Sequence, residues 1–130
     1  MSANLFLVNY ANADEQNLYD DGAITVEETF IDDEIFTQIQ PFLVEKEILE
    51  SKNAPDTVRI TVLPNDKLLE VENLLTSSYL KKIDDLNQKV LDKNISDKII
   101  DLGIFSNILK IIKRKTQEFH NHSSILIMIG

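Results

Sequence analysis

The 130-residue chain contains no cysteine, and this absence removes several kinds of chemistry at once. Without a thiol, the chain forms no disulfide, no thiolate metal site and no cysteine nucleophile. It also contains only three glycines, Gly22, Gly103 and Gly130, so neither a P-loop nor a dinucleotide-binding fingerprint can be written. Nucleotide-dependent catalysis by those routes is therefore excluded.

Long apolar runs are missing as well. The short apolar run Leu5–Val8 has no basic segment before it and is too short for a secretory signal. No stretch approaches the roughly 20 apolar residues that a membrane-spanning helix needs. These absences favour a cytoplasmic or nuclear protein that does not interact with a membrane.

Positive charge is scarce in the first half of the chain. The net charge is −9: residues 1–60 hold 13 acidic and 3 basic residues, net −10, and residues 61–130 hold 9 and 10, net +1. Nucleic acids are bound mainly by lysines and arginines that neutralise phosphates, so we expect no direct nucleic-acid binding through the acidic half. That half would instead attract a protein partner with a basic surface.

What remains is an ordinary globular composition, with 43% hydrophobic and 27% charged residues, and a length that supports one core. We therefore expect a single globular domain over residues 1–130. The chain closes with Ser124–Gly130, a run without polar alternation that is typical of a strand buried on both faces. An apolar end of this kind suggests the hypothesis that the chain is the N-terminal domain of a longer protein.

The apolar pattern predicts about four strands, at Asn4–Tyr10, Ile24–Phe30, Thr57–Val62 and Ser124–Gly130. It also predicts two long helices, one capped by Asn65 and one running from Asp97 to about Phe119 behind Ser96, with a break at residues 94–96. Residues 32–51 show helical spacing interrupted by Pro41, which predicts two short helices, the second opened by the proline. The expected fold class is α+β: a mixed sheet packed by two long C-terminal helices and by short helices in the N-terminal half.

The acidic run Asp32, Asp33 and Glu34, with Phe36 close behind it, is the first candidate site. Carboxylates suit calcium or magnesium, but adjacent residues rarely converge on one ion and the spacing does not match an EF-hand loop. The run is typical of a helix N-terminus, where negative charge complements the helix dipole. We expect no metal or cofactor here and assign these four residues to a partner-binding surface.

The basic run Lys113, Arg114 and Lys115 is the second candidate. It falls near the end of the last predicted helix, where positive charge complements the dipole. A second interpretation makes the run a docking patch for an acidic surface, such as the acidic half of a second copy. Homo-oligomers and hetero-oligomers are both compatible with such a patch.

The only two histidines, His120 and His122, have a spacing that places both on one side of an extended segment. Two imidazoles so placed can share a transition metal, or one can act as a general base. Their asparagine- and serine-containing surroundings are more typical of a solvated loop.

These observations favour a non-enzymatic protein–protein interaction domain: an assembly chaperone, an adaptor or a complex subunit. The acidic segment from Asp14 to Glu50 carries the hypothesis, and the apolar residues within it are candidate interface anchors, although the core is the simpler role for each. Two alternatives stay open. One is an acidic inhibitor that mimics nucleic acid, and the other is a small metal-dependent or hydrolytic enzyme that uses His120 or His122.

Overall fold

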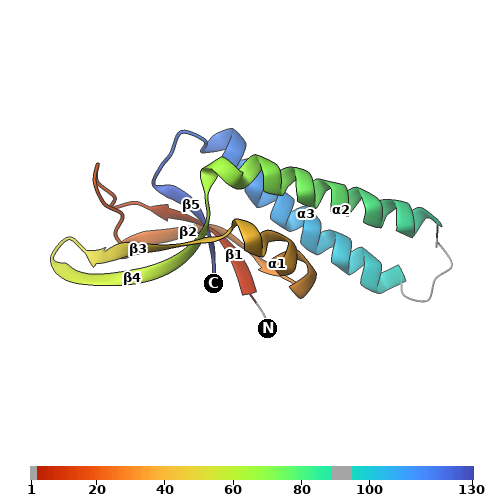
Figure 1. The fold of residues 1–130 in the computed structure, drawn as a ribbon, viewed down its shortest axis with the longest axis horizontal. Coiled ribbons are helices and arrows are strands. Elements are labelled where there is room, and N and C mark those ends of the chain that lie inside the picture. The colour runs from red at the N-terminus through yellow and green to blue at the C-terminus, as the bar shows by residue number, and fades with distance from the viewer. Residues whose placement is uncertain (1–2, 89–94) are drawn as a thin grey trace.

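The protein is described by a computed structural model that covers residues 3–88 and 95–130. Five strands form one sheet, and two long helices cover one side of it (Figure 1). In chain order the elements are β1 (Ala3–Tyr10), β2 (Ala23–Ile31), α1 (Asp33–Ile39), the 3₁₀ turn η1 (Gln40–Phe42), β3 (Val44–Ser51), β4 (Ala54–Leu63), the 3₁₀ turn η2 (Asn65–Lys67), α2 (Leu68–Gln88), α3 (Ile95–Glu118) and β5 (Ile125–Ile129). The α+β fold class predicted from the sequence is confirmed, but the sheet has five strands where about four were predicted, and it is antiparallel and not mixed.

The strand order is β2-β1-β5-β4-β3, and all neighbouring strands are antiparallel. The predicted C-terminal strand is the central one, and four of its five residues are buried. Leu126 faces one hydrophobic cluster, whereas Ile125, Ile127 and Ile129 face the other. The prediction of a strand buried on both faces is therefore confirmed.

The sequence prediction was wrong for residues 44–51, which form the fifth strand and not a second short helix. Asp32 caps α1, and Pro41 lies in the single 3₁₀ turn that ends the helical stretch. The strand was missed because Val44–Ser51 is mostly charged and only Ile48 is buried, so no period-two apolar pattern is visible. Pairing with β4 over nearly its full length stabilises the strand in spite of its composition.

The starts of the two long helices differ slightly from the prediction. Asn65 opens a 3₁₀ turn behind Pro64, and α2 begins three residues later at Leu68. Helix α3 begins at Ile95 and includes Ser96, and the predicted break at Asn94 lies outside the described residues. No helix in the described part of the chain is long and apolar enough to cross a membrane.

The sheet buries a hydrophobic cluster on each face. On the helix side, Leu7 and Ile127 of the sheet pack with Leu75, Phe105 and Ile108 of α2 and α3. On the opposite side the cluster consists of buried strand residues, namely Val8, Tyr10, Ile48, Ile60, Val62 and Leu126, with Ala13 and Leu18 of the β1–β2 loop packed against it. This second core positions the candidate site, because the loop must lie across the sheet to cover it.

Candidate functional site

The loop between β1 and β2, residues 11–22, is fastened to the edge strand β3 by backbone hydrogen bonds. The N–H of Leu49 donates to the carbonyl of Leu18 at 3.2 Å, and the N–H groups of Asp20 and Asp21 donate to the carbonyls of Leu49 and Glu50 at 2.9 and 2.8 Å. Tyr19 and Leu49 form a parallel bridge. Loop and hairpin therefore form one continuous surface at this end of the sheet.

Asp14 holds the inside of this loop with both carboxylate oxygens. Its Oδ1 accepts hydrogen bonds from the N–H groups of Gln16 at 2.9 Å and Asn17 at 2.8 Å, and its Oδ2 accepts one from the Tyr19 hydroxyl at 2.6 Å. The Tyr19 hydroxyl, followed by the two amides, lowers the pKa of Asp14, and the same bond raises the pKa of the Tyr19 hydroxyl. Asp14 is therefore a carboxylate at neutral pH, and its charge fixes the shape of the loop.

Gly22 ends the loop with a φ of 81°, a backbone conformation that other residues rarely adopt. A Cβ atom there would also clash with the side-chain amide of Asn12, which donates to the Asp21 carbonyl. We expect Gly22→Ala to lower the free energy of unfolding by about 1–3 kcal/mol, because it is strained in both respects. Urea denaturation measures this change.

Gly103→Ala is the matched control for Gly22→Ala. Gly103 lies within α3, and a Cβ atom there meets nothing within 4 Å. This control should raise stability by up to about 1 kcal/mol, since alanine is the better helix former. Equal stability of the Gly22→Ala variant and the natural protein would show that the loop is not held as described.

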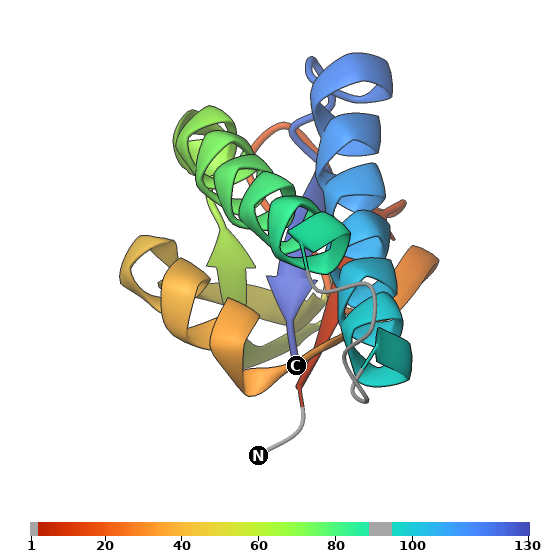
Figure 2. The same ribbon diagram turned by 90° about the vertical axis from the view of Figure 1, so that its right-hand side faces the viewer.

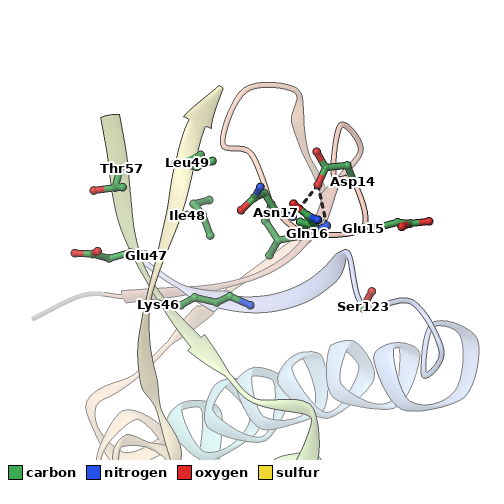
Figure 3. A pocket seen from close by; sticks show the side chains of 11 residues that line it. Asp14, Glu15, Gln16, Asn17, Lys46, Glu47, Ile48, Leu49, Thr57 and Ser123 are labelled. Carbon is green, nitrogen blue, oxygen red and sulfur yellow. Dashed lines mark hydrogen bonds between the residues drawn. The ribbon is translucent and has the colours of Figure 1, made fainter. Parts of the chain in front are cut away.

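The loop and the β3–β4 hairpin enclose a hollow of about 450 Å³ (Figure 3). Asp14 and Asn17 lie on the loop side of it, Ile48 and Thr57 on the hairpin side, and Lys46 at its lower edge (Figure 3). Two further hollows of about 500 and 490 Å³ adjoin the same loop and the turn of the hairpin. All three hollows thus open at one end of the molecule.

Six exposed carboxylates line these hollows, and we call them the acidic end: Asp14, Glu15, Asp20, Asp21, Glu47 and Glu50. Lys46 and Lys52 are the lysines among the lining residues, which gives six negative and two positive charges, net −4. The ammonium group of Lys52 lies 5.9 Å from the centre of the Tyr19 ring. Arg59 also pairs with Glu47 at 3.5 Å, and the surface remains negative on a backbone held by hydrogen bonds.

The candidate residues at the start of α1 lie away from the acidic end, at the other end of the sheet (Figure 1). Asp32 is the N-cap of α1 and accepts the Ile35 N–H at 2.9 Å, and Asp33 and Glu34 form the acidic first turn. Phe36 is half-buried and packs against the helix-side core. Their partner-binding role stays a prediction, and the structure does not join these residues to the loop.

Asp32, Glu34 and Asp101 of α3 bring carboxylate oxygens within 4.8 Å of one another. An ammonium group is already bound there: Nζ of Lys82 lies 3.0 Å from Glu34 Oε2 and also pairs with Asp101. Burial lowers the pKa of Lys82, but the hydrogen bonds to Asp101 and Glu34 outweigh it, so the pKa is raised overall. The cluster therefore joins α1, α2 and α3 through a lysine of the chain itself.

Burial, followed by the neighbouring Asp101 and Glu34, raises the pKa of the Asp32 carboxyl group, although the Ile35 amide opposes this. When the folded-state pKa is raised, the group contributes to the free energy of unfolding in its protonated form. The contribution of Asp32 is therefore fully present below the unfolded-state pKa and is lost as the pH rises through the folded-state pKa. Asp32→Asn keeps a capping oxygen and removes the charge, so it should stabilise the protein at neutral pH and have little effect below the unfolded-state pKa.

Asp32→Ala is the comparison for Asp32→Asn. It removes the cap of α1 and should cost about 1 kcal/mol in acid, where the carboxyl group is protonated. Thermal unfolding of both variants across the acidic pH range measures the two effects. A destabilised Asp32→Asn variant at neutral pH would contradict this explanation.

The basic run near the end of α3 does not form one surface patch. Lys113 is exposed, whereas Arg114 pairs with Glu27 of β2 at 3.2 Å and with Glu118 at 3.1 Å. Lys115 is only 1% exposed and donates to the carbonyls of Phe119 and His122 at 2.9 and 2.8 Å. A docking role for Lys115 is therefore inconsistent with its burial.

The two histidines lie in the connection between α3 and β5, and both are exposed. The His122 ring contacts the Phe119 ring edge to face, with 5.7 Å between the ring centres. Within residues 3–88 and 95–130, the group of potential metal ligands that converges is the Asp32 cluster, and it contains neither histidine. Among the described residues, neither histidine belongs to a group of three converging metal ligands, and a catalytic role for His120 or His122 stays a prediction.

Sequence reasoning identified the acidic segment but not which of its residues converge. The run Asp14, Glu15, Gln16 and Asn17 carries one usable signal, since an aspartate that binds the N–H groups two and three residues ahead forms a turn. The contact between Asp20–Asp21 and β3 was not predictable, because β3 itself was not predicted. Comparisons with known protein families, curated proteins and solved structures find no match.

Proposed function

We propose that this protein is a non-enzymatic interaction domain that binds a basic protein partner through the acidic end. The observation that supports it best is the convergence of six exposed carboxylates on a loop and hairpin joined by backbone hydrogen bonds. A complex subunit, an adaptor and an assembly chaperone for a basic protein would all use such a surface.

The hydrogen bonds that hold the loop in place favour binding. A loop that is ordered before the partner arrives does not lose conformational freedom on association, so more of the interaction energy appears as affinity. Asp14 and the contacts of residues 18–21 with β3 supply this order. The unbalanced negative charge also attracts a basic partner over distance and speeds encounter.

The hollow lined by Asp14 and Lys46 suits a long cationic side chain. Its walls include Ile48 and Leu49, and its rim carries Asp14, Glu15 and Glu47. Lysine and arginine lay their aliphatic stems on apolar surface and keep the charged group among polar partners. An arginine or lysine of the partner is therefore the anchor that this hollow fits.

A pull-down from lysate of the source cells tests the proposal, with the tagged natural protein beside a variant in which Asp20, Asp21 and Glu50 are replaced by lysine. Nuclease treatment and washes at low and high salt separate direct binding from nucleic-acid bridging. We expect a basic protein that the natural chain captures and the variant does not. Capture that nuclease abolishes, or equal capture by both chains, would contradict the proposal.

Competition by DNA or RNA distinguishes nucleic-acid mimicry from the broader role. If DNA displaces this chain from the captured protein, that protein binds nucleic acid and the acidic end through one surface. The chain would then be an inhibitor that mimics nucleic acid. A captured protein that DNA does not displace would favour a subunit or chaperone role.

A further inference from the structure

The distal half of the α2–α3 hairpin projects beyond the sheet (Figures 1 and 2). None of residues 76–87 and 97–104, whose side chains the structure describes, is buried. The helix-side core ends at Leu75 of α2 and Phe105 of α3, both fully buried. Beyond that level Tyr79 and Ile104 still pack against the edge of this core, and Ser78 and Lys82 contact α1.

Four apolar residues of the two helices lie close together on this arm, while Ile100, which is 63% exposed, lies on another side of α3. Leu80 and Ile99 are each 55% exposed, and Ile83 and Leu102, three residues after each of them, are half-buried. We call these four residues the arm patch. An i,i+3 pair lies on one face of a helix, so each helix contributes one such pair.

The ion pair between Lys82 and Asp101 shows that the two pairs lie on the same side of the hairpin. Lys82 also binds Glu34 of α1, so both charged residues point toward α1. Leu80 and Ile99 each precede their charged residue by two positions, which is about 200° of helix rotation. The arm patch therefore lies on the face turned away from α1, across the groove between the helices.

We infer that the arm patch binds a second copy of this chain. Charge favours this partner: residues 79–104 contain five lysines and five aspartates, net zero, so the remaining residues carry the whole net charge of −9. Two copies repel each other through their acidic surfaces, but the arm is neutral and offers both signs for pairing across an interface. A partner with a basic surface would bind the acidic end and not the neutral arm.

A two-fold axis through the arm patch brings Leu80, Ile83, Ile99 and Leu102 against the same residues of the second copy. Such an isologous contact closes after two subunits, and the four helices then bury the four-residue patches against each other. In one chain the β3–β4 hairpin and the free end of the arm lie at opposite ends of the molecule (Figure 1), so the acidic ends would point away from the interface in this dimer. The patch covers about one turn of each helix, so the dimer should be weak and concentration-dependent.

Sedimentation velocity of the full chain over a wide concentration range tests this inference. The natural protein should shift from 14.9 kDa toward twice that mass as its concentration rises. The double variant Leu80→Lys with Ile99→Lys should weaken dimerisation by at least about 100-fold, because four lysines then meet in one apolar contact. Far-UV circular dichroism and the melting temperature show whether the variant is folded.

The matched control is Leu69→Lys with Ile24→Lys, which adds the same charge at exposed apolar residues, 67% and 56% exposed, outside the arm patch. This control should dimerise like the natural protein. A natural protein that stays at 14.9 kDa throughout would overturn the inference, as would equal dimerisation of both double variants. The inference would also be overturned if the arm became protected from hydrogen–deuterium exchange only when a different protein is added.

Discussion

Replacement of Asp20, Asp21 and Glu50 by lysine should weaken binding of the basic partner by at least about 100-fold, if each reversal costs roughly 1 kcal/mol. The three side chains are exposed, and the adjoining backbone bonds do not use them. Folding should therefore be unaffected while the surface changes from attracting a cation to repelling it. Isothermal titration with the captured partner measures the loss, and the natural protein should show a steeper salt dependence than the variant.

A second triple variant separates the acidic end from the net charge of the whole chain. Glu28→Lys, Asp66→Lys and Glu72→Lys change the net charge by the same amount at positions outside the acidic end. We expect this control to lose less than about tenfold in affinity, since distant charges are screened by salt. An equal loss in both variants would show that the partner senses overall charge and not this surface.

Lys115→Met should lower the free energy of unfolding by about 2 kcal/mol, the largest stability effect that we expect from a single charged residue of this chain. The Lys115 ammonium group donates to the carbonyls of Phe119 and His122, which join the last turn of α3 to the connection that leads into β5. Methionine fills the same space but leaves both carbonyls without this donor. Burial lowers the pKa of Lys115, so the buried charge is itself unfavourable and little stability is lost when it is removed. The two lost hydrogen bonds should therefore account for most of the change in the free energy of unfolding.

Lys113→Met is the control for the Lys115 variant, because Lys113 lies two residues earlier on α3 and is exposed. Chemical denaturation should show a change of less than about 0.5 kcal/mol for it. A Lys115→Met variant that is as stable as the natural protein would mean that the two carbonyls are satisfied without the lysine.

Elements with a strong local pattern were predictable from the sequence. The alternation around Val58–Val62, the unbroken apolar run of β5 and the apolar spacing of α2 and α3 each match the structure. Asp32 stands directly before Asp33 and Glu34, and this acidic start marks α1 correctly. In these segments the residues that face the core are spaced by the geometry of the element itself.

The remaining features depend on contacts distant in sequence. Strand β3 is recognisable only beside β4, since its own residues are mostly charged. The attachment of residues 18–21 to β3 joins two segments about thirty residues apart, and no local pattern signals it. Lys115 resembled a surface residue because a run of lysines and arginines is usually exposed. Only the packing of α3 against β5 buries its side chain. The acidic composition therefore suggests the kind of partner that we propose, while the proposed place of binding depends on the fold.

Hydrogen–deuterium exchange of the chain with and without its purified partner tests the central claim most directly, because it maps the contact onto the sequence. The account predicts new protection at residues 12–22 and 46–53, where the loop and hairpin form the acidic end. Protection confined to α1, to α2 and α3, or to the connection with His120 and His122 would contradict it.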